Sequence, residues 1–424
     1  MSQADDLLGN KEGGSQFRLT RRSFLSKTSL FLASLGALSL ESAFDYACAA
    51  NSGDFSFAFI EGVHLSSGIP DNVKLLAESQ LFLQNALKTV SEQAVDFVLF
   101  GGDQVESPGR DDTFWQLFID VVQVLNCPWY FVFGEQDITG AAPVDRMRTY
   151  GPDLKGRGME PKDGGPECYW SLDPVPGVHL IGLDSAKANS NAGFIKQAQL
   201  DWLKKDLREN RGKLTIAVSH HPLLPPPPYD SGPPWEEFIV EQGAQTREVL
   251  GASKDVRLVL SGHVGINKIQ KERDIWYVSC PSLTVYPCQF KIFRVKSDGI
   301  LVETYQITYE ALVKKAKREL SSSRVSFQYS SRKPLSFLKV VEGEELDRNV
   351  FLPFAPGALP LKAPKKKKAP KQKASKASVD KKKTPTSSQQ KSDIKPQTAP
   401  VDSAGNGMEK LNAPAETGKE TGNN

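Results

Sequence analysis

The chain has 424 residues, of which 39% are hydrophobic and 24% charged, so it can form a substantial core and is not disordered throughout. Its net charge of +3 is unevenly distributed, because residues 361–400 contain 13 Lys and 2 Asp. That segment carries +11, which leaves a net charge of −8 on the rest of the chain.

Residues 1–50 have the features of an export signal rather than of a folded element. Residues 20–25 (TRRSFL) match the twin-arginine consensus, and an apolar stretch at 29–40 precedes a small-residue cleavage site at 47–49 (ACA). The apolar stretch is shorter than the ~20 residues of a membrane-spanning helix, so cleavage is favoured over an uncleaved anchor. We expect twin-arginine export to the periplasm or cell surface, with no transmembrane segment after cleavage.

Strand-like apolar runs alternate with helical patterns between residues 53 and 310, which predicts an α/β domain. Five of these runs, at 55–60, 97–100, 129–133, 214–218 and 256–260, are followed closely by carboxylate or imidazole side chains. Open α/β sheets bind ligands beyond the carboxyl ends of their strands, so we expect these side chains to gather in one place. They are Glu61, His64, Asp103, Glu135, Asp137, His220, His221 and His263.

Apolar residues at helical spacing predict helices at 75–90 and 199–207, and another at 310–320. Residues 222–234 form a proline-rich loop directly after His220 and His221, either shaping the entrance of a site or making a stiff surface excursion. The runs from 275 to 308 have the pattern of an antiparallel end to the sheet. Residues 311–360 form a C-terminal extension whose structure the sequence leaves open.

The last segment, residues 361–424, lacks aromatic residues and apolar periodicity and is predicted to be disordered. Its lysines suit electrostatic attachment to an anionic envelope polymer, and the alternative is a solvated low-complexity extension. Without aromatic side chains for stacking, sequence-specific nucleic-acid recognition is not expected.

Four cysteines follow the signal segment, and none of them has the C-x-x-C spacing of a zinc site. We expect either buried thiols or one structural disulfide, whose pairing the sequence does not give. The four are Cys127, Cys168, Cys280 and Cys288.

The series of strand-end motifs over residues 55–310 resembles the calcineurin-like metallophosphoesterases, in particular the bacterial branch related to cyclic-nucleotide phosphodiesterases. Supporting segments lie at 169–173 (YWSLD), 177–185 (GVHLIGLDS) and 199–203 (QLDWL). The resemblance implies a four-layer αββα sandwich of two mixed sheets flanked by helices. It also implies hydrolysis of phosphoesters at two metal ions bridged by an aspartate.

One of the two metal sites implied by the resemblance has a full set of ligand residues in this chain. Asp103 matches the bridging aspartate, and Glu135 stands where the family has a metal-binding Asn. His220 and His263 match the two metal-binding histidines. Two imidazoles with two carboxylates suit Fe, Mn or Zn, and the single complete ligand set predicts about one such ion per chain.

The other site is degenerate, because Gly62 and Gly265 replace two of its ligands and leave His64 and Asp103. Glu61 stands one residue before the lost aspartate and would nominally point to the opposite side of the strand. Gln136 replaces the family's histidine that protonates the leaving group. His64, when it is not a metal ligand, could act as a general acid, a role for which imidazole side chains are suited.

These features predict an exported, metal-dependent phosphoesterase that hydrolyses a phosphomonoester or phosphodiester through a metal-activated water. Its phosphate group is expected near His64, Gln136 and His221. Two alternatives remain open at this point: a non-catalytic metal-binding relative that retains the fold, and a surface-retention protein whose working part is the Lys-rich tail.

Overall fold

The structure is a computed structural model, and it describes residues 53–68, 71, 73–106, 113–138, 143–159 and 168–354, with the backbone alone for 143–149. The predicted export signal and the predicted disordered tail lie outside these residues. No helix in the described ranges combines the length and the apolar character needed to cross a bilayer.

The first sheet has six strands in the order β12-β11-β10-β1-β2-β3. Strands β1, β2 and β3 are parallel, whereas β10, β11 and β12 continue the sheet with antiparallel pairing. The sheet is therefore mixed. Its strands are β1 (Phe55–Ile60), β2 (Phe97–Phe100), β3 (Trp129–Phe131), β10 (Gln289–Lys296), β11 (Gly299–Gln306) and β12 (Val350–Pro353).

The second sheet also has six strands, in the order β4-β5-β6-β7-β9-β8. Its four central strands are parallel, and β4 and β8 add antiparallel edges. The strands are β4 (Trp170–Leu172), β5 (Val178–Leu183), β6 (Leu214–Ser219), β7 (Val256–Ser261), β8 (Lys268–Glu272) and β9 (Ile275–Ser279).

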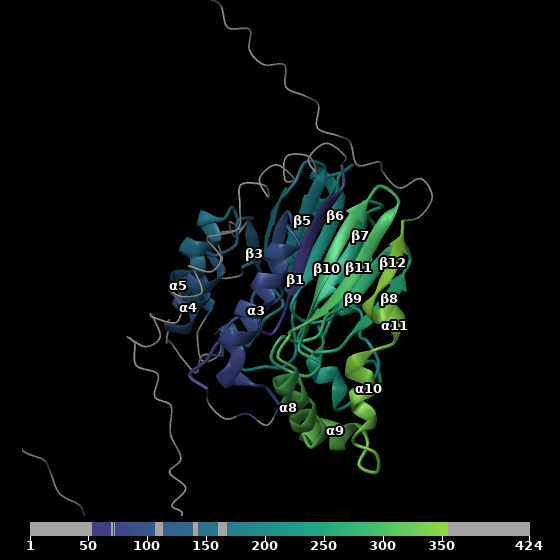
Figure 1. Cartoon of the computed structure of the whole chain (residues 1–424). Coiled ribbons are helices and arrows are strands. Elements are labelled where there is room, and N and C mark those ends of the chain that lie inside the picture. The colour runs from purple at the N-terminus through teal and green to yellow at the C-terminus, as the bar shows by residue number, and fades with distance from the viewer. Residues whose placement is uncertain are drawn as a thin grey trace, which may run out of the picture. The chain divides into compact units, whose positions relative to one another are not determined.

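Helices cover the outer faces of both sheets. Figure 1 shows α3 (Ser79–Glu92), α4 (Thr113–Val122) and α5 (Pro143–Gly156) on the side of β1 and β3, and the C-terminal helices grouped at one end of the strands. The other helices are α6 (Gln197–Glu209), α7 (Gly243–Gly251), α8 (Glu310–Ser321), α9 (Arg324–Tyr329), α10 (Ser336–Glu342) and α11 (Glu345–Arg348), with short 3-10 turns at Leu76–Glu78, Gln136–Ile138 and Trp235–Phe238.

Alternation along the buried strands produces the layers. In β6, Ile216 and Val218 pack into the core between the sheets, whereas Ala217 packs into a separate apolar cluster with α6. Strand β7 repeats the pattern, with Leu258 facing one way and Val259 the other. Because successive side chains of a strand point to opposite faces, two buried faces require fully apolar strands. The predicted four-layer αββα sandwich is confirmed.

The strands that carry the site motifs were predicted closely, and β1 and β2 have the expected bounds. The helices expected at 75–90, 199–207 and 310–320 are also present, as α3, α6 and α8. The expectation of an antiparallel end at 275–308 was only half right. Strands β10 and β11 pair antiparallel, but β9 joins the other sheet parallel to β7, because the chain crosses between the sheets after Ser279.

Residues 311–354 pack onto the main domain rather than forming a separate unit. Strand β12 extends the first sheet by pairing with β11. The Nζ of Lys291, which is fully buried, donates to Asn267 Oδ1 at 2.7 Å, to Thr304 Oγ1 at 2.7 Å and to the carbonyl of Asp347 at 3.0 Å. These bonds join strand β10 to α11 and tie the C-terminal segment to the first sheet.

All four described cysteines are free thiols, so the described part of the chain contains no disulfide. Burial raises the pKa of Cys127 to about 11 and those of Cys280 and Cys288 to about 12. Thiols of this kind are poor nucleophiles at neutral pH. Of the two alternatives that the sequence left open, the buried thiols are the one observed.

Replacing Lys291 with Met should lower the free energy of unfolding by about 3 kcal/mol, because three buried acceptors lose their donor. Burial lowers the pKa of Lys291 from 10.5 to about 8, so the unfolded chain binds its proton more tightly. The advantage of the wild type over Lys291→Met should therefore grow between pH 8 and 10. Urea unfolding measures both effects, and Lys296→Met, on an exposed residue of the same strand, is the control. Equal stability of the two variants would contradict a stabilising role for the hydrogen bonds of Lys291.

Candidate metal centre

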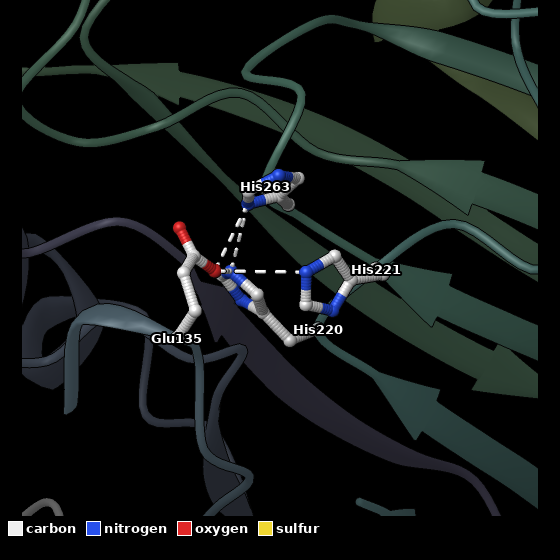
Figure 2. A group of neighbouring side chains, drawn as sticks. All are labelled: Glu135, His220, His221 and His263. Carbon is white, nitrogen blue, oxygen red and sulfur yellow. Dashed lines mark hydrogen bonds and ion pairs between the residues drawn. The ribbon is translucent and has the colours of Figure 1, made fainter. Parts of the chain in front are cut away.

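Four side chains converge at the carboxyl ends of three strands, β3, β6 and β7. Glu135 follows β3, His220 and His221 follow β6, and His263 follows β7. One ligand atom from each lies within 4.8 Å of all the others. Figure 2 shows the three imidazoles directed toward one carboxylate oxygen of Glu135. All four are buried or nearly so, and no other group of this kind occurs among the residues that the structure describes.

The distances within this group are those of ligands around a common centre. Glu135 Oε2 lies 3.1 Å from His220 Nε2, 3.2 Å from His263 Nδ1 and 3.6 Å from His221 Nε2. The two nitrogens of His220 and His263 are 3.2 Å apart. Two imidazoles bound tetrahedrally to one Zn²⁺ would place their nitrogens roughly 3.4 Å apart. The residues present therefore fit a metal ion.

The outer partners of the histidines fix which ring nitrogen faces the centre. His220 Nδ1 donates to the carbonyl of Gly101 at 2.8 Å, which leaves its Nε2 as the inward lone pair. His221 Nδ1 lies 3.0 Å from Ser185 Oγ, and its buried Nε2 has no hydrogen-bond partner. Metal-binding histidines typically use one nitrogen for the ion and the other for such a bond. This arrangement again fits a bound cation.

The same contacts shift the ionisation of the group. Burial would raise the pKa of Glu135, but the nearby His263 and His220 hold it well below its usual range. Burial would also lower the pKa of His220, but the carboxylates of Asp103 and Glu135 raise it well above the ordinary value. Burial, together with the charges of His263 and His220, lowers the pKa of His221. Without a metal, a proton on His220 therefore offsets the buried carboxylate charge.

Asp103 lies beside this group and is held by the backbone. Its Oδ2 is 3.5 Å from His220 Nε2, and its Oδ1 accepts the backbone N–H of Gln136 at 3.0 Å. Asp137 holds the surrounding loops, because its carboxylate accepts the N–H groups of Asp103, Val105 and Gly134 at 2.9, 3.0 and 2.9 Å. Its function is thus to order the loops rather than to bind metal.

His64 is directed toward Asp103 but also has a second partner. Its Nε2 is 3.8 Å from Asp103 Oδ2, and its Nδ1 is 2.7 Å from Glu106 Oε2. Gln136 has its amide nitrogen 3.3 Å from Glu135 Oε1, so its side chain lies at the edge of the cluster. All the residues predicted for the site are therefore near one another.

The glycines of the degenerate site are adapted to their positions. A Cβ at Gly62 would lie 2.3 Å from Ser282 Oγ, and the residue has φ +60°, so an aspartate there would require Ser282 to move. A Cβ at Gly265 would meet nothing within 4 Å, so the space of the second lost ligand is open. Two of the four family ligands are absent, and this half of the centre does not fit a metal ion as the first half does.

Glu61, which precedes the position of the lost aspartate, reaches a loop of the centre. It is buried, and its Oε1 accepts the backbone N–H of His263 at 2.9 Å, while its Oε2 has no hydrogen-bond partner. Burial raises the pKa of Glu61, against the lowering influence of His220. The sequence predicted a side chain facing away from the site, but Glu61 orients the loop that carries His263.

Two residues at or beside the centre have contacts that the sequence did not predict. His221 was expected to contact the substrate, whereas its complete burial and its distance from Glu135 favour a ligand role. Glu106 was not among the residues predicted for the site, and it lies beside His64. His179 is not near the cluster, since its nitrogens contact Asp206 at 2.7 Å and Asp173 at 2.9 Å.

Elemental analysis of the purified full-length chain should find about one Fe, Mn or Zn ion per molecule. The double variant His220→Ala/His263→Ala should lose it while remaining folded by circular dichroism. Because bound imidazole must be unprotonated and the pKa of His220 is raised, metal affinity should fall as the pH is lowered. Two ions per chain would mean that another residue rebuilds the degenerate site.

Comparison with known proteins agrees with this geometry. The calcineurin-like phosphoesterase family model matches residues 77–266. A protein of Synechococcus sp. named "Probable cyclic nucleotide phosphodiesterase" is 26% identical over 54% of this chain and 86% of its own length. A protein of Psychrobacter arcticus with the same name is 23% identical over 55% and 81% of the two chains.

The crystal structure of a dimetal phosphatase from Danio rerio covers 60% of this chain and 99% of its own, with a TM-score of 0.50 and 14% identity. At that identity the likeness concerns the fold, which is the two-sheet sandwich described above. Residues 77–266 therefore match the calcineurin-like phosphoesterase model, the two-sheet sandwich has the fold of that phosphatase, and the comparisons support a hydrolase.

Proposed function

We propose that this protein hydrolyses a phosphodiester or phosphomonoester with one metal ion held by Glu135, His220, His263 and Asp103, and with His221 as a further ligand. The observation that carries the proposal is the convergence of three imidazoles and a carboxylate, with the inward nitrogens of His220 and His221 set by outer hydrogen bonds. A bound ion would polarise a phosphoryl oxygen and lower the pKa of a water. The names of two relatives make a phosphodiester, and first a cyclic nucleotide, the substrate to test.

The residues around the proposed ion would orient the phosphate and supply a proton. His64 is 4% exposed and directs Nε2 toward Asp103, so it borders the space beside the ligands. With Gln136 in place of the family's histidine, His64 is the imidazole best placed to protonate the leaving-group oxygen. The backbone N–H of Gln136 holds Asp103, and the Gln136 side chain remains at the edge of the site to contact the phosphate.

Full-length protein with added Mn²⁺ should hydrolyse bis(p-nitrophenyl) phosphate, as measured by release of p-nitrophenolate. His64→Ala should lower kcat by ~100-fold or more, the usual contribution of a general acid, with unchanged metal content. Asp103→Asn should lower both activity and metal content. Full activity of His64→Ala would remove the general-acid role, and full activity of Asp103→Asn would refute the site assignment.

A specific observation favours a second candidate, a non-catalytic metal-binding relative. Gly62, Gln136 and Gly265 stand in place of two metal ligands and a proton donor in one region of the centre. Gly62 also has a positive φ, a backbone conformation that favours glycine. A wild-type chain that binds one metal ion but turns over neither aryl esters nor cyclic nucleotides would establish this candidate instead.

We further propose that the protein is exported by the twin-arginine route and held at the envelope by its Lys-rich tail. The support is the sequence of residues 20–25, the apolar stretch after them and the 13 Lys within 361–400. A like-charged polymer would be repelled, so an anionic partner is the one that fits.

Replacing Arg21 and Arg22 by Lys should leave the protein in the cytoplasmic fraction. Deletion of residues 361–424 should instead release exported protein from the envelope, as high salt should release the intact protein, because the attachment is electrostatic. Immunoblots of cell fractions measure both effects. Unchanged retention of the truncated chain would show that the tail is not the attachment.

A further inference from the structure

His64 lies where two strand-end loops are joined. It follows β1 with φ +49°, and its backbone N–H donates to the carbonyl of Asp103 at 2.8 Å. The next residues continue the connection, because Leu65 donates to Gln104 at 3.0 Å and Glu106 donates to Leu65 at 2.8 Å. A non-glycine residue with positive φ is uncommon and is maintained only by its surroundings. The backbone thus brings Glu106 beside the His64 ring.

The Glu106 carboxylate connects this ring to a lysine. Its Oε2 is 2.7 Å from His64 Nδ1 and 2.8 Å from Lys74 Nζ, and its Oε1 is 3.0 Å from the same Nζ. The side chains of Glu106 and Lys74 are only 20% and 22% exposed, and that of His64 is 5% exposed. An ion pair shielded to this extent is screened less by solvent than a surface pair.

These contacts determine which nitrogen of the His64 ring carries a hydrogen and how the ring is oriented. Burial would raise the pKa of Glu106, but the hydrogen bond and charge of His64 and the charge of Lys74 lower it to about 2. Glu106 is therefore an acceptor, and His64 Nδ1 must carry a hydrogen. That bond fixes the rotation of the ring and directs Nε2 toward Asp103. A carboxylate that orients a histidine in this way is the arrangement of catalytic triads.

Lys74 has a separate effect. It contacts both oxygens of Glu106, so it restricts the rotation of the carboxylate as well as offsetting its charge. It lies on the segment before α3, whereas Glu106 follows β2, and the three side chains therefore come from three parts of the chain. They lie in the half of the centre where Gly62 and Gly265 stand in place of two metal ligands.

We infer that Glu106 and Lys74 are positioning residues for His64, which hold its Nε2 toward the leaving-group oxygen in the half of the centre that lacks two metal ligands. This inference rests on the proposed phosphoesterase activity and on His64 as its proton donor. Neither residue touches the substrate, and each acts through the imidazole.

The test compares two substrates whose leaving groups differ in their need for a proton. Phenolate, with a pKa near that of Tyr at ~10, needs a proton more than the more acidic p-nitrophenolate does. Glu106→Ala and Lys74→Met in the full-length chain should lower kcat for diphenyl phosphate by roughly 10- to 100-fold, the usual effect of removing an outer partner. The loss for bis(p-nitrophenyl) phosphate should be several-fold smaller, with KM and metal content unchanged.

Glu106→Gln keeps an acceptor for Nδ1 and should restore part of the loss. The matched control is another partly exposed Lys–Glu pair, Lys315 and Glu78, 2.8 Å apart. Glu78→Gln and Lys315→Met should leave the ratio of the two rates unchanged. Equal losses on both substrates, or none, would overturn the positioning role, because misfolding or metal loss affects both alike.

Nitrogen NMR of ¹⁵N-histidine-labelled protein separates failure of this inference from failure of the proposed activity. Wild-type protein should show His64 with Nδ1 protonated and hydrogen-bonded, and Glu106→Ala should lose that signature. If the wild type hydrolyses neither ester, the proposed function is refuted while the spectrum still decides whether Glu106 holds the ring. A wild-type spectrum with unprotonated Nδ1 would overturn the inference whatever the activity.

Discussion

The centre of this protein depends on one electrostatic constraint, the burial of the Glu135 carboxylate at the carboxyl ends of the strands. A buried carboxylate is tolerated only when it is paired with positive charge or with donors. Here three imidazoles surround it, one of them oriented by a carbonyl and one by a hydroxyl. Either a proton on His220 or a metal ion meets the requirement. The fold supplies the geometry, because parallel strands bring their carboxyl ends to a common edge.

The two halves of the centre meet this constraint differently. The half around Glu135 has converging lone pairs and few competing donors, which suits a cation from solution. The half around His64 contains its own cation, since Lys74 pairs with Glu106 beside the imidazole. Glycines at 62 and 265 are compatible with this second arrangement, because they add no side chain to that half. The half of the centre that has lost two metal ligands is thus the half in which Lys74 and Glu106 contact each other and Glu106 contacts His64.

The sequence predicted the parts of the structure that depend on local pattern. Short apolar runs without helical period located β1 and β2, and motif order located Asp103, Glu135, His220 and His263. The sheet of β9 could not be predicted, because its parallel partner β7 is selected by tertiary packing. The ligand role of His221 and the contact of Glu106 with His64 were beyond the sequence. They depend on Ser185 and Lys74, which are distant in the chain.

The free, buried thiols have a consequence for how the domain matures. Because the described part of the chain contains no disulfide and its deeply buried thiols carry raised pKa values, the sandwich needs no oxidant to reach its native state. It can be completed, with its metal ligands assembled, in a reducing compartment. In an oxidising compartment the buried Cys280 and Cys288 thiols would remain poor nucleophiles, because their pKa values are raised.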